Sequence, residues 1–134
     1  MVKETITYTN YNGVEVTEDF YFNLTKAEVT EMELSIDGGL AEMLTRIVAA
    51  KDAPTIINTF KEFVLKCYGE KSPDGKYFMK EDENGRPLSD KFKHTEAYSI
   101  VFMKLAFDAD AAAKFINNVI PKDLASAVPT PVAE

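Results

Sequence analysis

The sequence predicts an α+β protein in which an N-terminal β-hairpin packs on a bundle of about five α-helices and a flexible C-terminal tail follows. Three observations support this fold class. Residues 2–9 alternate with a period of two, which is typical of a half-buried strand. From Thr25 the apolar spacing changes to the helical period. Residues 126–134 are small and proline-rich, so they offer little apolar area to bury. We therefore expect one globular domain over residues 1–125 and a disordered tail over 126–134.

The β-hairpin is predicted over residues 1–23. An Asn12-Gly13 pair separates two runs of residues with high β-propensity, and Asn-Gly is a preferred sequence for the tight turn of a hairpin. In the second run, Phe20 and Phe22 are two residues apart, so they share one face of the strand. We expect this aromatic face to pack against the helices.

The helical part is predicted over residues 25–125. Thr25 and Glu28 have the spacing of a capping box, which indicates a first helix over roughly residues 25–35. Capping residues, apolar spacing and helix-ending Gly or Pro predict the other helices, with Asp108 expected to cap the last of them. These four helices are expected over residues 40–48, 54–69, 90–107 and 109–120.

Residues 70–88 interrupt the helical pattern. Ser72-Pro73-Asp74-Gly75 and Asn84-Gly85 predict two turns on either side of an extended Tyr77-Phe78-Met79 segment. Residues 70–81 also match a calcium-binding EF-hand loop in part. The match fails at its first position, which is Glu rather than Asp, and the proline within it restricts the loop. We therefore expect plain turns and no metal site.

Composition and charge exclude several classes of function. A net charge of −7 disfavours nucleic acid and anionic membranes as partners, because both need clustered Lys and Arg. The chain has one cysteine, Cys67, on a predicted apolar helix face, and one histidine, His94, among polar residues. We expect neither to be catalytic, and we expect no cofactor. The start of the sequence has no apolar signal region, so we expect a cytoplasmic protein.

Apolar residues that adapt to different partners are abundant. The chain has nine Phe, six Tyr and five Met, and Met is common on binding faces that accept varied partners. Core packing explains any single one of these residues, but as a group they permit an exposed binding face. The candidate partner-binding residues are Met32, Met43, Tyr77, Phe78 and Met79.

Four segments of the sequence carry a resemblance to a known family. They are FYFNLTKAE at residues 20–28, TEMEL at 30–34, GGLAEML at 38–44 and CYGEKSPDG at 67–75. Over roughly residues 10–125 the chain resembles the tail assembly chaperones of bacteriophages with long, non-contractile tails, the siphophages. The resemblance implies a non-enzymatic protein of the bacterial host cytoplasm that coats the tape measure protein and recruits tail tube subunits. It supplies no catalytic residues.

Self-association and two other functions also follow from the sequence analysis. A small protein that coats an extended partner is expected to form homo-oligomers through heterologous contacts, as rings or open spirals. One alternative function is an acidic phage or bacterial adaptor that inhibits a nucleic-acid-binding enzyme, which clustered carboxylates on one face would favour. The other is an enzyme with a carboxylate-only site, which metal-dependent thermal stabilisation would reveal.

Overall fold

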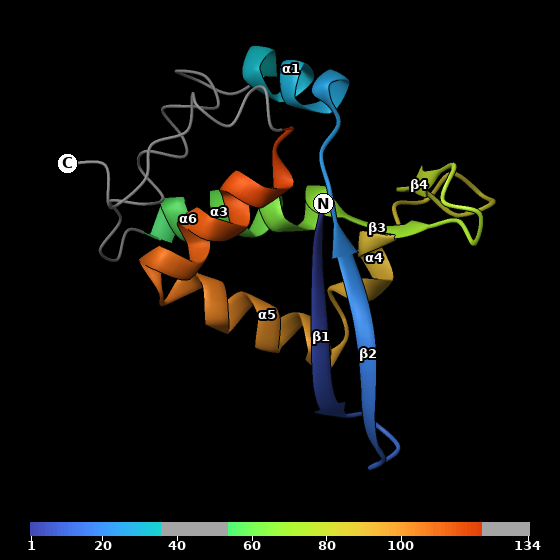
Figure 1. Cartoon of the computed structure of the whole chain (residues 1–134). Helices are drawn as coiled ribbons and strands as arrows, with labels where there is room; N and C mark the ends of the chain where they lie inside the picture. Colours follow the sequence, from blue (N-terminus) through green and yellow to red (C-terminus); the bar gives the residue numbers. More distant parts are fainter. Residues whose placement is uncertain (36–53, 122–134) are drawn as a thin grey trace.

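The computed structural model describes residues 1–35 and 54–121 of the 134-residue chain (Figure 1). The helix predicted over residues 40–48 and the tail predicted over 126–134 lie outside these described residues. The elements are β1 (Val2–Thr9), β2 (Glu15–Phe22), α1 (Lys26–Ser35), α3 (Pro54–Cys67), β3 (Tyr68–Lys71), β4 (Phe78–Met79), α4 (Ser89–Phe92), α5 (Glu96–Ala106) and α6 (Ala109–Val119). Strands and helices together confirm the predicted α+β class. Neither described stretch contains a helix with the length and apolar character that crossing a membrane requires.

The predicted hairpin is confirmed. Strands β1 and β2 are antiparallel, with Val2 opposite Phe22 at one end and Thr9 opposite Glu15 at the other. The turn between them has Gly13 at a φ of 79°, a backbone conformation that residues other than glycine rarely adopt. Figure 1 shows the far end of the hairpin, which we call the hairpin tip (residues 10–14), extending beyond the helices.

The sheet is larger than the sequence predicted, because β3 and β4 extend it to the order β1-β2-β3-β4. The expectation that the preceding helix continues to Gly69 is wrong, since α3 ends at Cys67 and Tyr68 begins β3. Gly69 and Tyr68 lie opposite Tyr21 and Phe22 of β2. Pairing with the edge of β2 therefore places these residues in a strand. A strand of only four residues that forms by long-range pairing has no recognisable hydrophobic period in the sequence.

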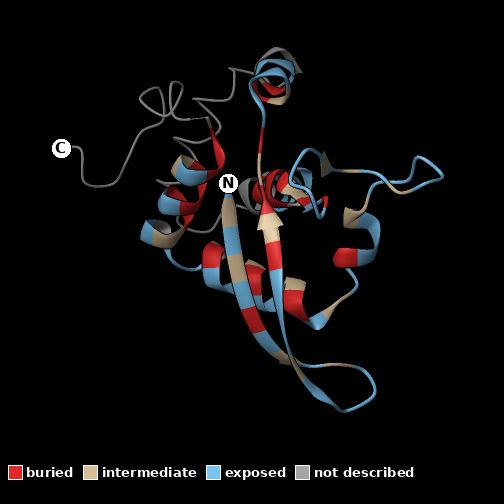
Figure 2. Cartoon of the chain, turned by 45° about the vertical axis from the view of Figure 1, so that its right-hand side comes forward, coloured by how far each residue is buried: buried red, intermediate tan, exposed pale blue. Residues whose placement is uncertain are grey.

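The hydrophobic core lies where the helices meet the inner face of the hairpin. Phe22 is fully buried, and its ring lies 5.9 Å from that of Tyr68, 5.8 Å from that of Phe92 and 5.4 Å from that of Phe115. These partners come from β3, α4 and α6. Figure 2 shows buried residues concentrated at this meeting point and exposed residues at the hairpin tip. The aromatic face predicted for β2 is therefore the central contact of the core.

The single helix predicted over residues 90–107 is wrong, because two helices, α4 and α5, occupy that stretch. Thr95 separates them with an extended backbone, at φ −96° and ψ 155°. Its hydroxyl donates to the carbonyl of Phe92 at 2.7 Å and accepts from the amide of Tyr98 at 3.1 Å. One threonine thus closes α4 and caps α5.

Two predicted helix caps are confirmed. The amide of Thr25 donates to Glu28 Oε1 at 2.8 Å, and the amide of Glu28 donates to Thr25 Oγ1 at 3.2 Å, which makes the reciprocal capping box of α1. Asp108 Oδ1 accepts from the amides of Asp110 and Ala111 at the start of α6. Both caps are local contacts, which is why the sequence spacing was sufficient to find them.

Candidate functional site

Residues 68–88 form an arm that projects from the core, carrying β3, β4 and two turns. Figure 1 shows this arm on one side of the hairpin, with α3, α5 and α6 on the other. In its first turn Asp74 accepts hydrogen bonds from the Ser72 hydroxyl at 2.6 Å and from the Lys76 amide at 3.0 Å. The Asp74 carboxylate is therefore used to build the turn. Within residues 1–35 and 54–121, no group of three His, Cys, Asp or Glu side chains is placed to hold a metal ion.

The arm is shaped by a close contact at Gly69. A Cβ atom at this position would lie 2.5 Å from Phe78 Cε2 and 2.7 Å from the backbone oxygen of Met79. Only glycine leaves room for β4 to lie this close to β3. Phe78 is consequently partly buried, while its neighbours Tyr77 and Met79 are 58% and 40% exposed.

Lys80 attaches the base of the arm to two helices and to the segment that follows β2. Its Nζ donates to Glu28 Oε2 at 2.9 Å, to the backbone oxygen of Asn23 at 3.0 Å and to that of Lys66 at 2.6 Å. These partners lie in α1, just after β2, and in the last turn of α3. A cation at the C-terminal end of a helix also interacts favourably with the helix dipole. Lys80 thereby holds the arm at a defined position relative to α1 and α3.

The contact with Lys80 changes the pKa of Glu28. Partial burial by itself would raise the pKa of its carboxyl group, but the hydrogen bond from Lys80 and that from the Thr25 amide outweigh burial. The pKa of Glu28 is therefore lower than its ordinary value. The carboxylate stays charged and paired at neutral pH.

A pocket of about 840 Å³ lies between α1, α3 and the arm. Apolar side chains contribute to its lining, and charged side chains of both signs surround them. The apolar residues are Leu24, Met32, Leu65, Tyr68 and Pro87, and the charged residues are Glu28, Glu31, Glu62, Glu81, Lys66 and Lys80. A pocket with this lining can accept apolar side chains and bind charged groups at its edge.

The structure separates the predicted partner-binding residues. Met32 is only 5% exposed and lines the pocket, where it belongs to the hydrophobic core. Tyr77 and Met79 are two residues apart on the arm, so they share one side of it. Phe78 points to the opposite side and packs at Gly69. Met43 lies outside the described residues.

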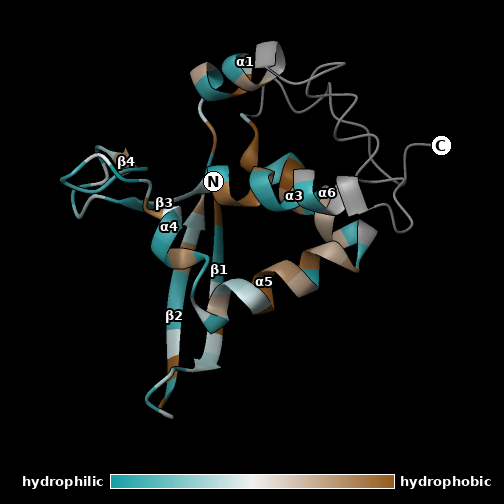
Figure 3. Cartoon of the chain, turned by 180° about the vertical axis from the view of Figure 1, so that it is seen from behind, coloured by the Kyte–Doolittle hydropathy of each residue, from teal (hydrophilic) through white to brown (hydrophobic). Residues whose placement is uncertain are grey.

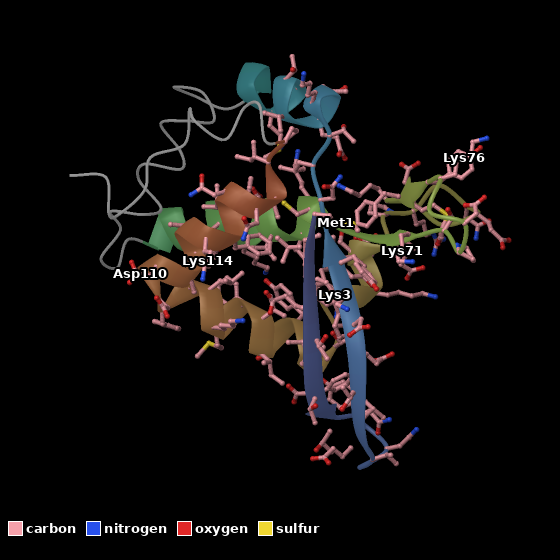
Figure 4. All side chains as sticks on the ribbon, viewed as in Figure 1. Met1, Lys3, Lys71, Lys76, Asp110 and Lys114 are labelled. Carbon is pink, nitrogen blue, oxygen red and sulfur yellow. The ribbon has the colours of Figure 1, made fainter. Side chains whose placement is uncertain are left out.

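Two lysines of the arm lie over aromatic rings, one ring on the arm itself and one on β2. Lys76 Nζ lies 5.5 Å from the Tyr77 ring centroid, and Lys71 Nζ lies 5.8 Å from that of Tyr21. Figure 4 shows Lys76 at the outer turn of the arm and Lys71 nearer its base. These contacts are cation-π interactions, which hold the two lysines beside aromatic rings.

Sequence reasoning missed an exposed apolar face on α5. Ile100, Met103 and Phe107 are 41%, 53% and 74% exposed, and their i, i+3, i+7 spacing puts them on one side of the helix. We call these three residues the α5 outer face. The sequence contained the pattern that predicts such a face, because α5 has apolar residues on two of its sides and only one side is needed to pack against the core.

The two residues considered as a nucleophile and base lie in different environments. Cys67 is fully buried, and burial raises the pKa of its thiol. The positive charge of Lys80 acts in the opposite direction, but its effect is smaller than that of burial. His94 is exposed in the turn between α4 and α5. Cys67 therefore occupies the core position that the sequence predicted for it.

The fold and this site define a small α+β protein whose described surface features are an apolar pocket, a projecting arm and an exposed helix face. Comparison with known families agrees with a role in protein binding. The profile of the phage tail assembly chaperone family matches residues 1–131, so the chain belongs to that family. This membership gives it a general chaperone role, with protein partners in tail assembly. Neither the curated proteins nor the solved structures give a match to the chain.

Proposed function

We propose that this chaperone binds the tape measure protein in the host cytoplasm, keeps it in solution and helps to recruit tail tube subunits. The observation that carries the proposal is the apolar pocket beside the arm. The arm supplies Lys80, Glu81 and Pro87 to the pocket lining, and Tyr77 and Met79 are exposed on the same arm. We propose that these two side chains belong to the same binding surface. We propose no catalytic role and no cofactor.

An amphipathic helical segment is the ligand that suits this surface. Its apolar side chains would contact Met32, Leu65 and Tyr68, and its lysines would face Glu31 and Glu62. Met32 is mostly buried, and the part of it that lines the pocket belongs to a flexible side chain of the kind that tolerates varied apolar neighbours. The net charge of −7 would keep the resulting complexes apart in solution.

Co-expression tests the proposal directly. The test partner is the protein encoded downstream of this chain, which the proposal expects to be long and helix-rich. The measurement is the fraction of that partner recovered in the soluble extract. We expect a larger soluble fraction when the chaperone is present. An unchanged soluble fraction would contradict the proposal and favour the acidic adaptor, whose four pocket carboxylates would then be the binding groups.

Substitutions on the arm test the location of the binding surface. Replacing Tyr77 and Met79 together by Ser should weaken partner binding more than tenfold without loss of folding, because both side chains are exposed. Phe78 is left intact because it packs at Gly69. The matched control replaces Tyr11 and Val14 of the hairpin tip by Ser, since they are 77% and 53% exposed. Equal binding by both double variants would contradict the arm as the binding surface.

A further inference from the structure

The exposed positions of α5 and its C-terminal cap follow a pattern that reads the same in both chain directions. They are Glu96, Ser99, Ile100, Met103, Lys104 and Phe107. Reversing the helix exchanges position 96 with 107, position 99 with 104 and position 100 with 103. The opposite side of α5 is buried in the core through Ala97, Val101 and Leu105. In the part of the chain that the structure describes, the outward side of α5 is therefore exposed, and its spacing is self-complementary.

We infer that the α5 outer face binds the same face of a second copy of the chain, with the two helices antiparallel about a two-fold axis. In this register Ile100 of each copy meets Met103 of the other. Phe107 of each copy covers the end of the contact, near Glu96 of the other copy. The small side chain of Ser99 in each copy lets the two helices approach. A face that pairs with itself in this way forms a closed dimer, which differs from the rings or open spirals of heterologous contacts that the sequence analysis expected.

The charges on α5 favour the antiparallel arrangement. Glu96 of one copy lies within a helical turn of Lys104 of the other, so the dimer contains two such pairs of opposite charge. A parallel pairing would instead bring the two Lys104 side chains together and the two Glu96 side chains together. Lys104 is already positioned beside this face by its ion pair with Glu4, at 3.0 Å. Opposite charges flanking an apolar contact set the orientation of paired helices.

The small size of the face determines the strength of the dimer. Helix α5 has 11 residues, so it is about 16 Å long, and three large apolar side chains form its exposed seam. Such a contact buries less than the roughly 1,200 Å² of a standard interface. The dimer should therefore be weak, so that the fraction of dimer rises with protein concentration over the range that can be measured. Figure 3 shows α5 along the outer edge of the molecule, hydrophobic over much of its length.

The pocket remains open in this dimer, because the residues that line it come from α1, α3, α4, the arm and the segment before α1. Each dimer thus carries two pockets. If the proposed function holds, one dimer can bind two segments of the same extended partner, and the second contact forms at a raised effective concentration. The dimer itself does not depend on the proposed function.

Analytical ultracentrifugation of the full chain tests the inference. We expect a reversible monomer–dimer equilibrium across the micromolar to millimolar range. Met103→Glu places two carboxylates in the apolar seam, so it should weaken the dimer by at least about tenfold. The control, Val14→Glu, makes the same kind of change on the exposed hairpin tip and should leave the equilibrium unchanged. Circular dichroism and urea unfolding of both variants establish that each is folded.

A charge exchange tests the register. Glu96→Lys should weaken the dimer because it places like charges beside Lys104 of the second copy, and the double variant Glu96→Lys with Lys104→Glu should recover most of the lost affinity. The inference is overturned by a strictly monomeric chain, by oligomers larger than a dimer, or by a Met103→Glu variant that dimerises as well as the native chain. Absence of recovery in a folded double variant overturns the antiparallel register.

Discussion

At the scale of single residues, Gly69 and Lys80 determine how the arm meets the core. Gly69 has no side chain to block β4, and Lys80 places one cation against three oxygen atoms from separate parts of the chain. Neither role was predicted from the sequence. Both depend on residues that are distant along the chain, so local composition carries no signal for them.

Replacing Gly69 by Ala should destabilise the protein by about 1–3 kcal/mol, the usual range for overpacking. The added methyl group would lie 2.7 Å from the backbone oxygen of Met79, which cannot move as a flexible side chain can. Urea unfolding measures the change. The control is Gly75→Asn, because that position has open space around it and Asn tolerates its φ of 76°. A Gly69→Ala variant as stable as the control would contradict the close approach of β4.

Replacing Lys80 by Met should destabilise the protein by about 1–3 kcal/mol at neutral pH, because Glu28 and two backbone oxygens lose their donor. The lowered pKa of Glu28 stabilises the native chain above about pH 4.5, and this contribution is lost as pH falls through the lower native pKa. The stability difference between native chain and variant should therefore narrow in acid. Urea unfolding from pH 3 to 7 measures it, with the exposed Lys76→Met as control. A difference that stays constant with pH would contradict the role of Glu28.

At the scale of elements, local contacts explain which predictions succeeded. The capping box of α1, the N-cap of α6 and the Asn-Gly turn involve residues at most a few positions apart, so their spacing alone identifies them. The sequence predicted one helix over residues 90–107, but only α5 places several buried residues at helical intervals, namely Ala97, Val101 and Leu105, while the buried residue of α4 is Phe92. Only the conformation of Thr95 separates the two helices.

Replacing Thr95 by Ala should cost about 1 kcal/mol of stability, because α5 loses its N-cap and the Phe92 carbonyl loses a donor. Thr95→Ser keeps the hydroxyl and should stay within about 0.5 kcal/mol of the native chain. Thermal and urea unfolding of the two variants measure the difference. Equal destabilisation by Ala and Ser would show that the hydroxyl does not hold the boundary between α4 and α5.

At the scale of the whole molecule, Phe22 connects the sheet to the helices. Replacing it by Ala should destabilise the protein by about 3–5 kcal/mol, because a fully buried ring with three aromatic neighbours leaves a cavity in the core. A loss of this size is a large part of the total stability of a small protein. Tyr11→Ala is the control, since Tyr11 is 77% exposed. Similar unfolding midpoints for the two variants would contradict the central position of Phe22.

By itself the sequence determined the α+β class, the hairpin, the caps of α1 and α6, and the resemblance to tail assembly chaperones. These features depend on period, turn residues and short motifs, which are local properties of the chain. The tertiary structure decided that Tyr68 enters a strand, that Lys80 links the arm to α1 and α3, and that Met32 lines a pocket while the α5 outer face stays exposed. These outcomes depend on which distant segments pack together, because an apolar side chain becomes either core or binding surface only through its neighbours.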